Sequence, residues 1–140
     1  MERAVIFDMD GTLADVSGIR HLLPDFDAFH LASVDSPPHD WVARRARWCP
    51  TVGIAPIVVT ARRARYRHVT AWWLAMHEIP SAALIMRADH DGRPDAVVKR
   101  DMLAQIRRSW HPILAYDDRP EVLAMWKEQG LTTLRVPGWR

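Results

Sequence analysis

Polar side chains follow three apolar runs of this sequence, at the point where each run ends. They are Asp8 and Asp10 after residues 4–7, Thr60 at the end of residues 51–60, and Asp117 and Asp118 after residues 112–116. If the runs are strands of one parallel sheet, their carboxyl ends meet at the edge where such sheets bind ligands. Taken alone, the first run and its two acidic residues are also compatible with an ordinary strand followed by an acidic turn.

The chemistry of this set points to a metal ion and a phosphoryl group. Several carboxylates in one pocket cannot all be ionised without a cation, because burying charge is costly. Ligands that are all oxygens select a hard ion, so the sequence predicts Mg²⁺. A carboxylate in such a pocket could attack phosphorus and form an aspartyl-phosphate. Lys99, in the first turns of a predicted helix, and the Thr60 hydroxyl would then neutralise the phosphoryl oxygens together with Mg²⁺.

Strands and helices alternate along the chain in a way that could position these residues. The pattern predicts strands at 4–7, 51–60, 82–86, 112–116 and 131–136, and helices at 39–49, 64–78, 94–106 and 120–129. This alternation predicts an α/β fold, a Rossmann-like parallel sheet with helices on both faces. Residues 15–40 contain three of the prolines and little periodicity, so we expect an irregular insert there with one short helix. We expect one domain over residues 1–140, with this insert at about 15–40 and a minimal cap.

Composition narrows the class of protein. A hydrophobic content of 49% with 26% charged residues is ordinary for a globular protein. The net charge of +2 is too small for an overall field to indicate nucleic acid. No apolar run approaches the roughly 18 residues that cross a bilayer, the N-terminus does not look like a signal peptide, and the single cysteine cannot form an internal disulfide. We therefore expect a cytoplasmic protein without a membrane partner.

Three short strings and one lysine resemble the four motifs of the haloacid dehalogenase superfamily of phosphotransferases. The strings are FDMDGT at residues 7–12, VVT at 58–60 and YDDR at 116–119, and the lysine is Lys99. The resemblance implies that Asp8 is the nucleophile and that Asp10 protonates the leaving oxygen and later activates water. It also implies that Thr60 and Lys99 hold the transferring phosphoryl group. An aspartate two positions after the nucleophile supplies the acid and base that a phosphatase needs, so we expect phosphomonoester hydrolysis.

The same resemblance implies a Mg²⁺ site. The ligands would be the carboxylate of Asp8, the main-chain carbonyl of Asp10 and one of the last acidic pair. We expect Asp118 to be the direct ligand, and Asp117 to lie behind it or to bond to Lys99.

Longer strings narrow the substrate. Residues 7–14, 57–62, 84–87, 93–99 and 116–126 resemble the 3′-phosphatase domain of bacteriophage-type polynucleotide kinase–phosphatase. This resemblance implies removal of 3′-phosphates from DNA or RNA ends in nucleic acid repair. By position, it implies that Arg62 and Asp95 serve the site; Arg20 matches only approximately, because the spacing differs by one residue. The few residues left for a cap also favour a macromolecular substrate.

Simple geometry adds to these assignments. Asp95 and Lys99 are four positions apart on a predicted helix, so they share a face and could pair. Arg62 follows the strand end, where its planar fork suits phosphate. Arg87 and Arg93 flank a predicted loop at 88–92, which could contact a nucleic-acid end or simply be solvated. Arg63, Arg65 and Arg67 are equally compatible with a solvated helix face.

Three functions remain open at this point. The first is a Mg²⁺-dependent phosphatase acting on polynucleotide 3′ ends, the second a nucleotidase or small-molecule phosphatase whose insert restricts access, and the third a non-catalytic nucleic-acid-binding module. No GxxxxGK[ST] phosphate loop is present, so we expect any kinase activity to come from elsewhere. A kinase or ligase domain or subunit of a repair system is therefore an expected partner.

Overall fold

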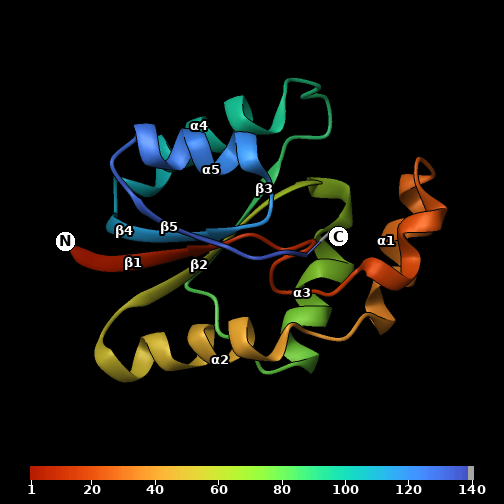
Figure 1. Ribbon diagram of the computed structural model, residues 1–140, viewed down its shortest axis with the longest axis horizontal. Helices are drawn as coiled ribbons and strands as arrows, with labels where there is room; N and C mark the ends of the chain where they lie inside the picture. The colour runs from red at the N-terminus through yellow and green to blue at the C-terminus, as the bar shows by residue number, and fades with distance from the viewer. Residues whose placement is uncertain (139–140) are drawn as a thin grey trace.

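The computed structural model describes residues 1–138, in which a five-stranded parallel sheet lies between two layers of helices (Figure 1). The strands are β1 (Glu2–Phe7), β2 (Ala55–Arg63), β3 (Ala83–Arg87), β4 (Trp110–Asp117) and β5 (Thr132–Arg135), in the spatial order β3-β2-β1-β4-β5. The chain starts in the middle of the sheet, adds β2 and β3 on one side, and returns to add β4 and β5 on the other. The strand order therefore reverses beside β1, and open α/β sheets bind ligands at the carboxyl ends of the strands at such a point.

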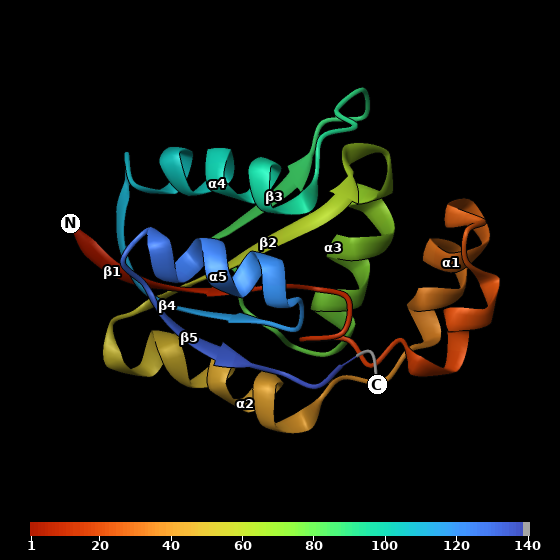
Figure 2. The same cartoon turned by 45° about the horizontal axis from the view of Figure 1, so that its top comes forward.

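The helices cover both faces of the sheet. They are α1 (Phe26–Ala32), α2 (Asp40–Trp48), α3 (Arg67–Met76), α4 (Asp95–Ile106) and α5 (Pro120–Glu128). Figures 1 and 2 show α4 and α5 on one face and α2 and α3 on the other, with α1 set apart. The α/β fold predicted from the sequence is confirmed. None of the described helices is long and apolar enough to cross a membrane.

Side chains of β1 alternate between two separate cores. Val5 and Phe7 pack with residues of α2 and α3. Ala4 and Ile6 pack with residues of α4 and α5. Because successive side chains of a strand point to opposite faces, a strand covered on both sides must be apolar throughout. This explains why the first run is continuous rather than alternating.

The second strand starts and ends later than its apolar run predicts. Residues 49–52 form a 3₁₀ turn, and Gly53 takes the left-handed conformation, with φ of 73°, before β2 begins at Ala55. That conformation favours glycine because it has no Cβ. Beyond Thr60 the pairing with β3 shifts register, and β2 continues to Arg63. The extension carries Arg62 past the strand end that holds Thr60.

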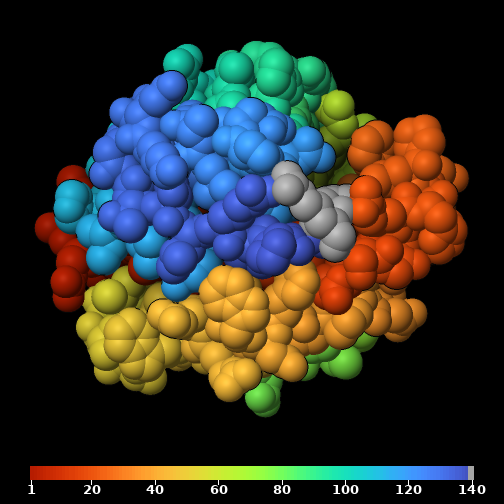
Figure 3. Space-filling view, viewed as in Figure 1, coloured from red at the N-terminus to blue at the C-terminus, as the bar shows by residue number. Residues whose placement is uncertain are grey.

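The insert between β1 and α2 lies at one end of the molecule (orange in Figure 3). It contains the single α-helix expected there, α1, between two 3₁₀ turns at Ser17–Leu22 and Ser33–Asp35. Side-chain hydrogen bonds between described residues join it to the rest of the fold: Tyr66 Oη to Asp27, Arg62 Nη2 to Ser33 Oγ (3.1 Å), and Trp73 Nε1 to the carbonyl of Ser36 (2.8 Å). These ties hold α1 close to the carboxyl edge of the sheet.

Candidate active site

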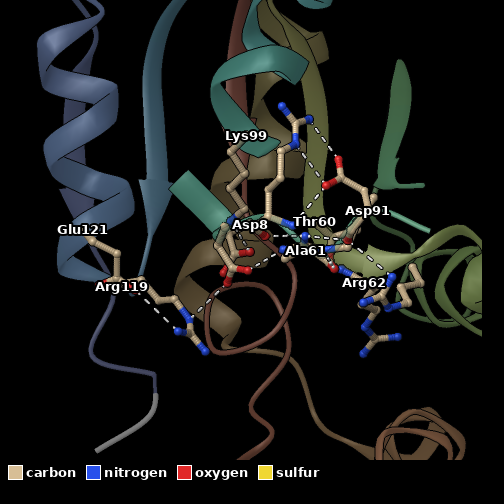
Figure 4. Close-up of polar contacts among 12 residues, drawn as sticks. Asp8, Thr60, Ala61, Arg62, Asp91, Lys99, Arg119 and Glu121 are labelled. Carbon is tan, nitrogen blue, oxygen red and sulfur yellow. Dashed lines mark hydrogen bonds and ion pairs between the residues drawn. The ribbon is translucent and has the colours of Figure 1, made fainter. Parts of the chain in front are cut away.

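Asp8, which directly follows β1, is the centre of a buried polar cluster (Figure 4). The ammonium of Lys99, on α4, donates to Asp8 Oδ1 at 2.8 Å and to Asp117 Oδ2, at the end of β4, at 2.9 Å. The hydroxyl of Thr12 donates to Asp8 Oδ2 at 2.9 Å. The ends of β1 and β4 and the helix α4, which are distant in the sequence, thus bring Asp8, Asp117 and Lys99 together.

The loop after Asp8 folds back so that Thr12 can reach it. Gly11 has a φ of 83°, which a residue with a Cβ rarely adopts. The backbone N–H of Thr12 then donates to the carbonyl of Met9 at 3.3 Å. Gly138 lies directly against this loop, since a Cβ added to it would come within 1.5 Å of the carbonyl oxygen of Gly11. The loop from Asp8 to Thr12 therefore has a close backbone neighbour.

Three buried carboxylates form a candidate metal site. Ligand oxygens of Asp8, Asp117 and Asp118 lie within 4.8 Å of one another. Among the described residues, Asp118 Oδ2 is buried and has no hydrogen-bond partner. Three carboxylates and the one ammonium of Lys99 leave a formal charge of −2 if all are ionised, and an all-oxygen set of that charge fits a hard divalent cation. The residues present therefore fit the Mg²⁺ that the sequence predicts.

Crowding of these acids shifts their proton affinity. Burial, followed by the charge of Asp117, raises the pKa of Asp8 to about 6. Burial and the charge of Asp8 raise the pKa of Asp118 to about 9. Burial opposes the charge on Lys99, but Asp117 and Asp8 together hold its pKa above the ordinary value. The cluster thus retains protons that a bound cation would replace.

Asp10 points to a different partner. Arg62 donates from Nε and Nη2 to the two carboxylate oxygens of Asp10, at 2.8 and 2.6 Å, and from Nη1 to Thr70 Oγ1 at 3.0 Å. Burial by itself would raise the pKa of Asp10, but the guanidinium of Arg62 holds it below the ordinary value. Arg62 lines the pocket but is only 3% exposed, and its guanidinium bonds to Asp10, Thr70 and Ser33.

Thr60 is placed as the sequence predicts. Its hydroxyl oxygen accepts the backbone N–H of Arg62 at 3.1 Å, which leaves the hydroxyl proton available to a ligand. Thr60 lines the same pocket as Asp8, Asp10 and Lys99, a cavity of about 930 Å³. The four residues expected to carry the chemistry are therefore together.

The proposed pairing of Asp95 with Lys99 is wrong. Asp95 lies in the first turn of α4 and pairs with Arg87 at 2.5 Å and with Arg119 at 3.6 Å, whereas Lys99 pairs with Asp8 and Asp117. Two acids at the strand ends compete for the buried lysine, and helical spacing alone does not reveal them. Asp95 instead helps to hold the arginines around the pocket.

The other predicted arginines have different positions. Arg87 is buried and donates to the carbonyls of Ala61, Asp91 and Arg93 as well as to Asp95, so it braces the loop after β3. Arg93 is exposed at the pocket, where it pairs with Asp91 and Asp101. Arg20 lies exposed in the first 3₁₀ turn and is not among the residues that line the pocket.

Sequence reasoning missed several residues at the site. Arg119, the last letter of YDDR, is half-exposed and lines the pocket; Arg65, for which the sequence left a solvated helix face equally open, is also half-exposed and lines it. Thr12 was likewise inside the first motif. His30 gave no signal, because it lies in the irregular insert. Burial and the nearby Arg62 lower the pKa of His30 to about 4, so its imidazole is neutral at pH 7.

The fold and the site together define a phosphatase of the haloacid dehalogenase type. The sequence matches the family of polynucleotide kinase PNKP phosphatase domains over residues 2–138, and the chain belongs to that family. The resemblance inferred from the motifs is thereby confirmed.

Solved structures agree with this assignment. Chains of the Pnkp1/Rnl/Hen1 complex and of the Pnkp1/Rnl/Hen1 RNA repair complex are each 28% identical, with TM-scores of 0.85 and 0.86 over 97% of this chain. This chain covers 46% and 42% of those two chains, less than half of their length. The class C acid phosphatase from Bacillus anthracis with tungstate bound is 13% identical, with a TM-score of 0.77 over 98% of this chain and 67% of that one. At that identity the likeness shows the fold.

Proposed function

We propose that this phosphatase removes terminal 3′-phosphates from polynucleotides with the help of Mg²⁺. The observation that carries the proposal is a buried nucleophile in a pocket whose rim bears exposed arginines, in a member of the polynucleotide kinase phosphatase family. Arg65, Arg93 and Arg119 each expose about half of the side chain. Each of these guanidinium groups also pairs with a neighbouring carboxylate, but its exposed part offers hydrogen-bond donors that suit the phosphates of a polyanion.

The first step forms a covalent intermediate. An oxygen of Asp8 attacks phosphorus, the bond from phosphorus to the 3′ oxygen breaks, and Asp10 in its acid form gives its proton to that oxygen. Lys99 and the Thr60 hydroxyl stabilise charge on the phosphoryl oxygens. Mg²⁺ held by Asp8, Asp118 and the main-chain carbonyl of Asp10 would supply further charge neutralisation when bound.

The second step releases phosphate. Asp10, now a carboxylate, takes a proton from water, the water oxygen attacks phosphorus, and the bond to Asp8 breaks. The two hydrogen bonds from Arg62 fix the direction in which Asp10 can give and take this proton. Because these bonds favour the carboxylate form, they suit the second step in particular, where Asp10 acts as the base.

A nucleotidase is the second candidate, since the insert walls one side of the pocket and a volume of about 930 Å³ also suits a small ligand. The test is phosphate release from a 3′-phosphorylated oligonucleotide, a 3′-mononucleotide and an aryl phosphate, each with Mg²⁺ and with chelator. Asp8→Asn is the control for turnover at this site. Preference for the oligonucleotide supports end processing, and equal or better turnover of the mononucleotide supports the nucleotidase.

We also propose that the phosphatase works beside a kinase or ligase domain or subunit in a cytoplasmic repair system. The similarity to a chain of an RNA repair complex supports this, and it makes RNA as well as DNA oligonucleotides the substrates to compare.

A further inference from the structure

The insert contributes a cluster of rings to the pocket wall. Phe26 and His30 come from α1, and Tyr66 comes from the turn before α3. The ring centroids of Phe26 and His30 are 6.2 Å apart with nearly parallel planes, and those of His30 and Tyr66 are 4.3 Å apart. All three rings line the same cavity as Asp8.

Packing alone does not account for this cluster. Phe29, on the same helix, is 2% exposed and packs edge-on against His30, so it supplies the apolar anchor that α1 needs. Phe26 is 58% exposed, so its ring adds little to that anchor. An aromatic ring left open at the mouth of a pocket gains energy only when a ligand covers it.

His30 adds an unsatisfied polar atom at the same place. The residue is 5% exposed, and within residues 1–138 its Nδ1 has no hydrogen-bond partner. Most buried polar side-chain atoms are paired, because leaving one unpaired costs free energy. His30 lines the cavity but Nδ1 is itself buried, so a ligand completes this bond when the neighbouring side chains make way for it.

We propose that Phe26, His30 and Tyr66 form a subsite for the nucleoside that carries the terminal phosphate. Its base stacks on the exposed rings, and His30 Nδ1 forms a hydrogen bond with the base or sugar. Stacking on aromatic rings suits an enzyme of polynucleotide ends because every base has a π-face. Arg65, whose guanidinium lies 5.9 Å from the centre of the Tyr66 ring, is placed to meet the next phosphate of the chain.

This subsite rests on the proposed function, so the experiment must separate the two. The substrates are a 3′-phosphorylated trinucleotide, the same molecule without its terminal base, and an aryl phosphate. The variants are Phe26→Ala, which removes the open ring, and His30→Phe, which keeps a ring but removes the nitrogen. Leu31→Ala is the matched control, because Leu31 is on the same helix, 69% exposed and outside the pocket lining.

We expect the native enzyme to prefer the trinucleotide over its abasic form by roughly 5- to 150-fold in kcat/KM, as one stacked base provides. Phe26→Ala should remove most of that preference, and His30→Phe should reduce it by about 2- to 12-fold, the effect of one hydrogen bond. Leu31→Ala should keep the native preference and the native turnover of all three substrates. In Asp8→Asn protein, a terminal 2-aminopurine should show quenched fluorescence on binding, and the Phe26→Ala substitution should restore it.

Two results would overturn the subsite while the proposed function stands. One is equal turnover of the trinucleotide and its abasic form by an enzyme that still prefers both to the aryl phosphate. The other is an equal loss on all three substrates in Phe26→Ala and His30→Phe, which means that the rings only support the fold. If the native enzyme prefers the aryl phosphate, the polynucleotide function fails and the subsite fails with it.

Discussion

The guanidinium of Arg62 donates two parallel hydrogen bonds to Asp10, from Nε to Oδ2 and from Nη2 to Oδ1. The guanidinium is buried and is held in turn by Thr70 and Ser33. Lysine cannot reproduce this fork, because it presents a point charge on a flexible stem. In the proposed mechanism, the direction in which Asp10 moves a proton therefore depends on a residue that is itself only 3% exposed.

Replacing Arg62 by lysine should lower kcat by about 10²-fold, the size of effect expected when a catalytic group is displaced by about 1 Å. It should also raise the pKa of Asp10, since the burial that opposes its charge remains. A general acid works in its protonated form, so the fall of kcat on the basic side of the pH profile should move to higher pH. Arg44→Lys, at an exposed position of α2, is the control. A native profile in Arg62→Lys would show that Asp10 is not positioned in this way.

Replacing Lys99 by methionine should destabilise the metal-free protein by about 3–5 kcal/mol, because it leaves buried carboxylates without their counter-ion. Asp8 and Asp117 both lose the ammonium that now lies 2.8 and 2.9 Å from them. Urea unfolding in the presence of chelator measures the change. Lys127→Met, on the exposed side of α5, should stay within about 0.5 kcal/mol of the native protein. Equal midpoints for the two variants would contradict the buried ion pairs.

The acid cluster should make Mg²⁺ binding depend on pH. The fold raises the pKa of Asp8 to about 6 and that of Asp118 to about 9. An acid whose pKa is raised by folding stabilises the fold at pH values below its ordinary pKa, and this contribution is lost as the pH rises through the raised value. Metal-free protein should therefore lose stability between about pH 4 and about pH 9, and Mg²⁺ should restore more of it at the upper end.

Thermal unfolding with chelator and with Mg²⁺, across this range of pH, measures the effect. Asp118→Asn should remove most of the gain from Mg²⁺ and flatten the pH dependence of the metal-free Tm, because it deletes the acid with the larger shift. The same gain from Mg²⁺ at every pH, or an unaltered gain in Asp118→Asn, would argue against a cation at these carboxylates.

Replacing Gly138 by alanine should lower kcat by displacing the loop from Asp8 to Thr12. Its Cβ would come within 1.5 Å of the Gly11 carbonyl oxygen, so one of the two backbones must move, at a cost of about 1–3 kcal/mol. Since Gly11 lies between Asp10 and Thr12, we expect kcat to fall along with the midpoint of unfolding. Gly18→Ala is the control, because a Cβ at Gly18 meets nothing within 4 Å. Native kcat in Gly138→Ala would mean that turnover does not depend on this contact.

Features that depend on local pattern were predictable from the sequence. Apolar runs and helical spacing predicted the alternation of strands and helices, and parallel strands bring their carboxyl ends together, so Asp8, Thr60 and Asp117 were expected at one edge. Where several charged groups that are distant in the sequence compete for one partner, the pairing was not predictable in this way. Asp95 shares a helix face with Lys99, but it bonds to Arg87 because Asp8 and Asp117 occupy the lysine.

Residues of the insert were the hardest to assign. One ring partner of His30 is Phe26 on the same short helix, but the other is Tyr66, which lies outside the insert and which no local pattern connects to His30. Arg62 and Arg87 were expected near the site and are there, but position along a strand does not decide whether a long side chain points to substrate or to protein.

The Lys99–Asp8 pair also affects how the protein folds. These residues are 91 positions apart in the sequence, and Lys99 and Asp117 are 18 apart. Closing so long a loop costs conformational entropy before any contact compensates for it, and such non-local pairings slow folding. Asp8 and Lys99 therefore come together with Asp117 only after α4 and β4 have packed against β1. In refolding, recovery of turnover should accordingly lag behind the recovery of helix.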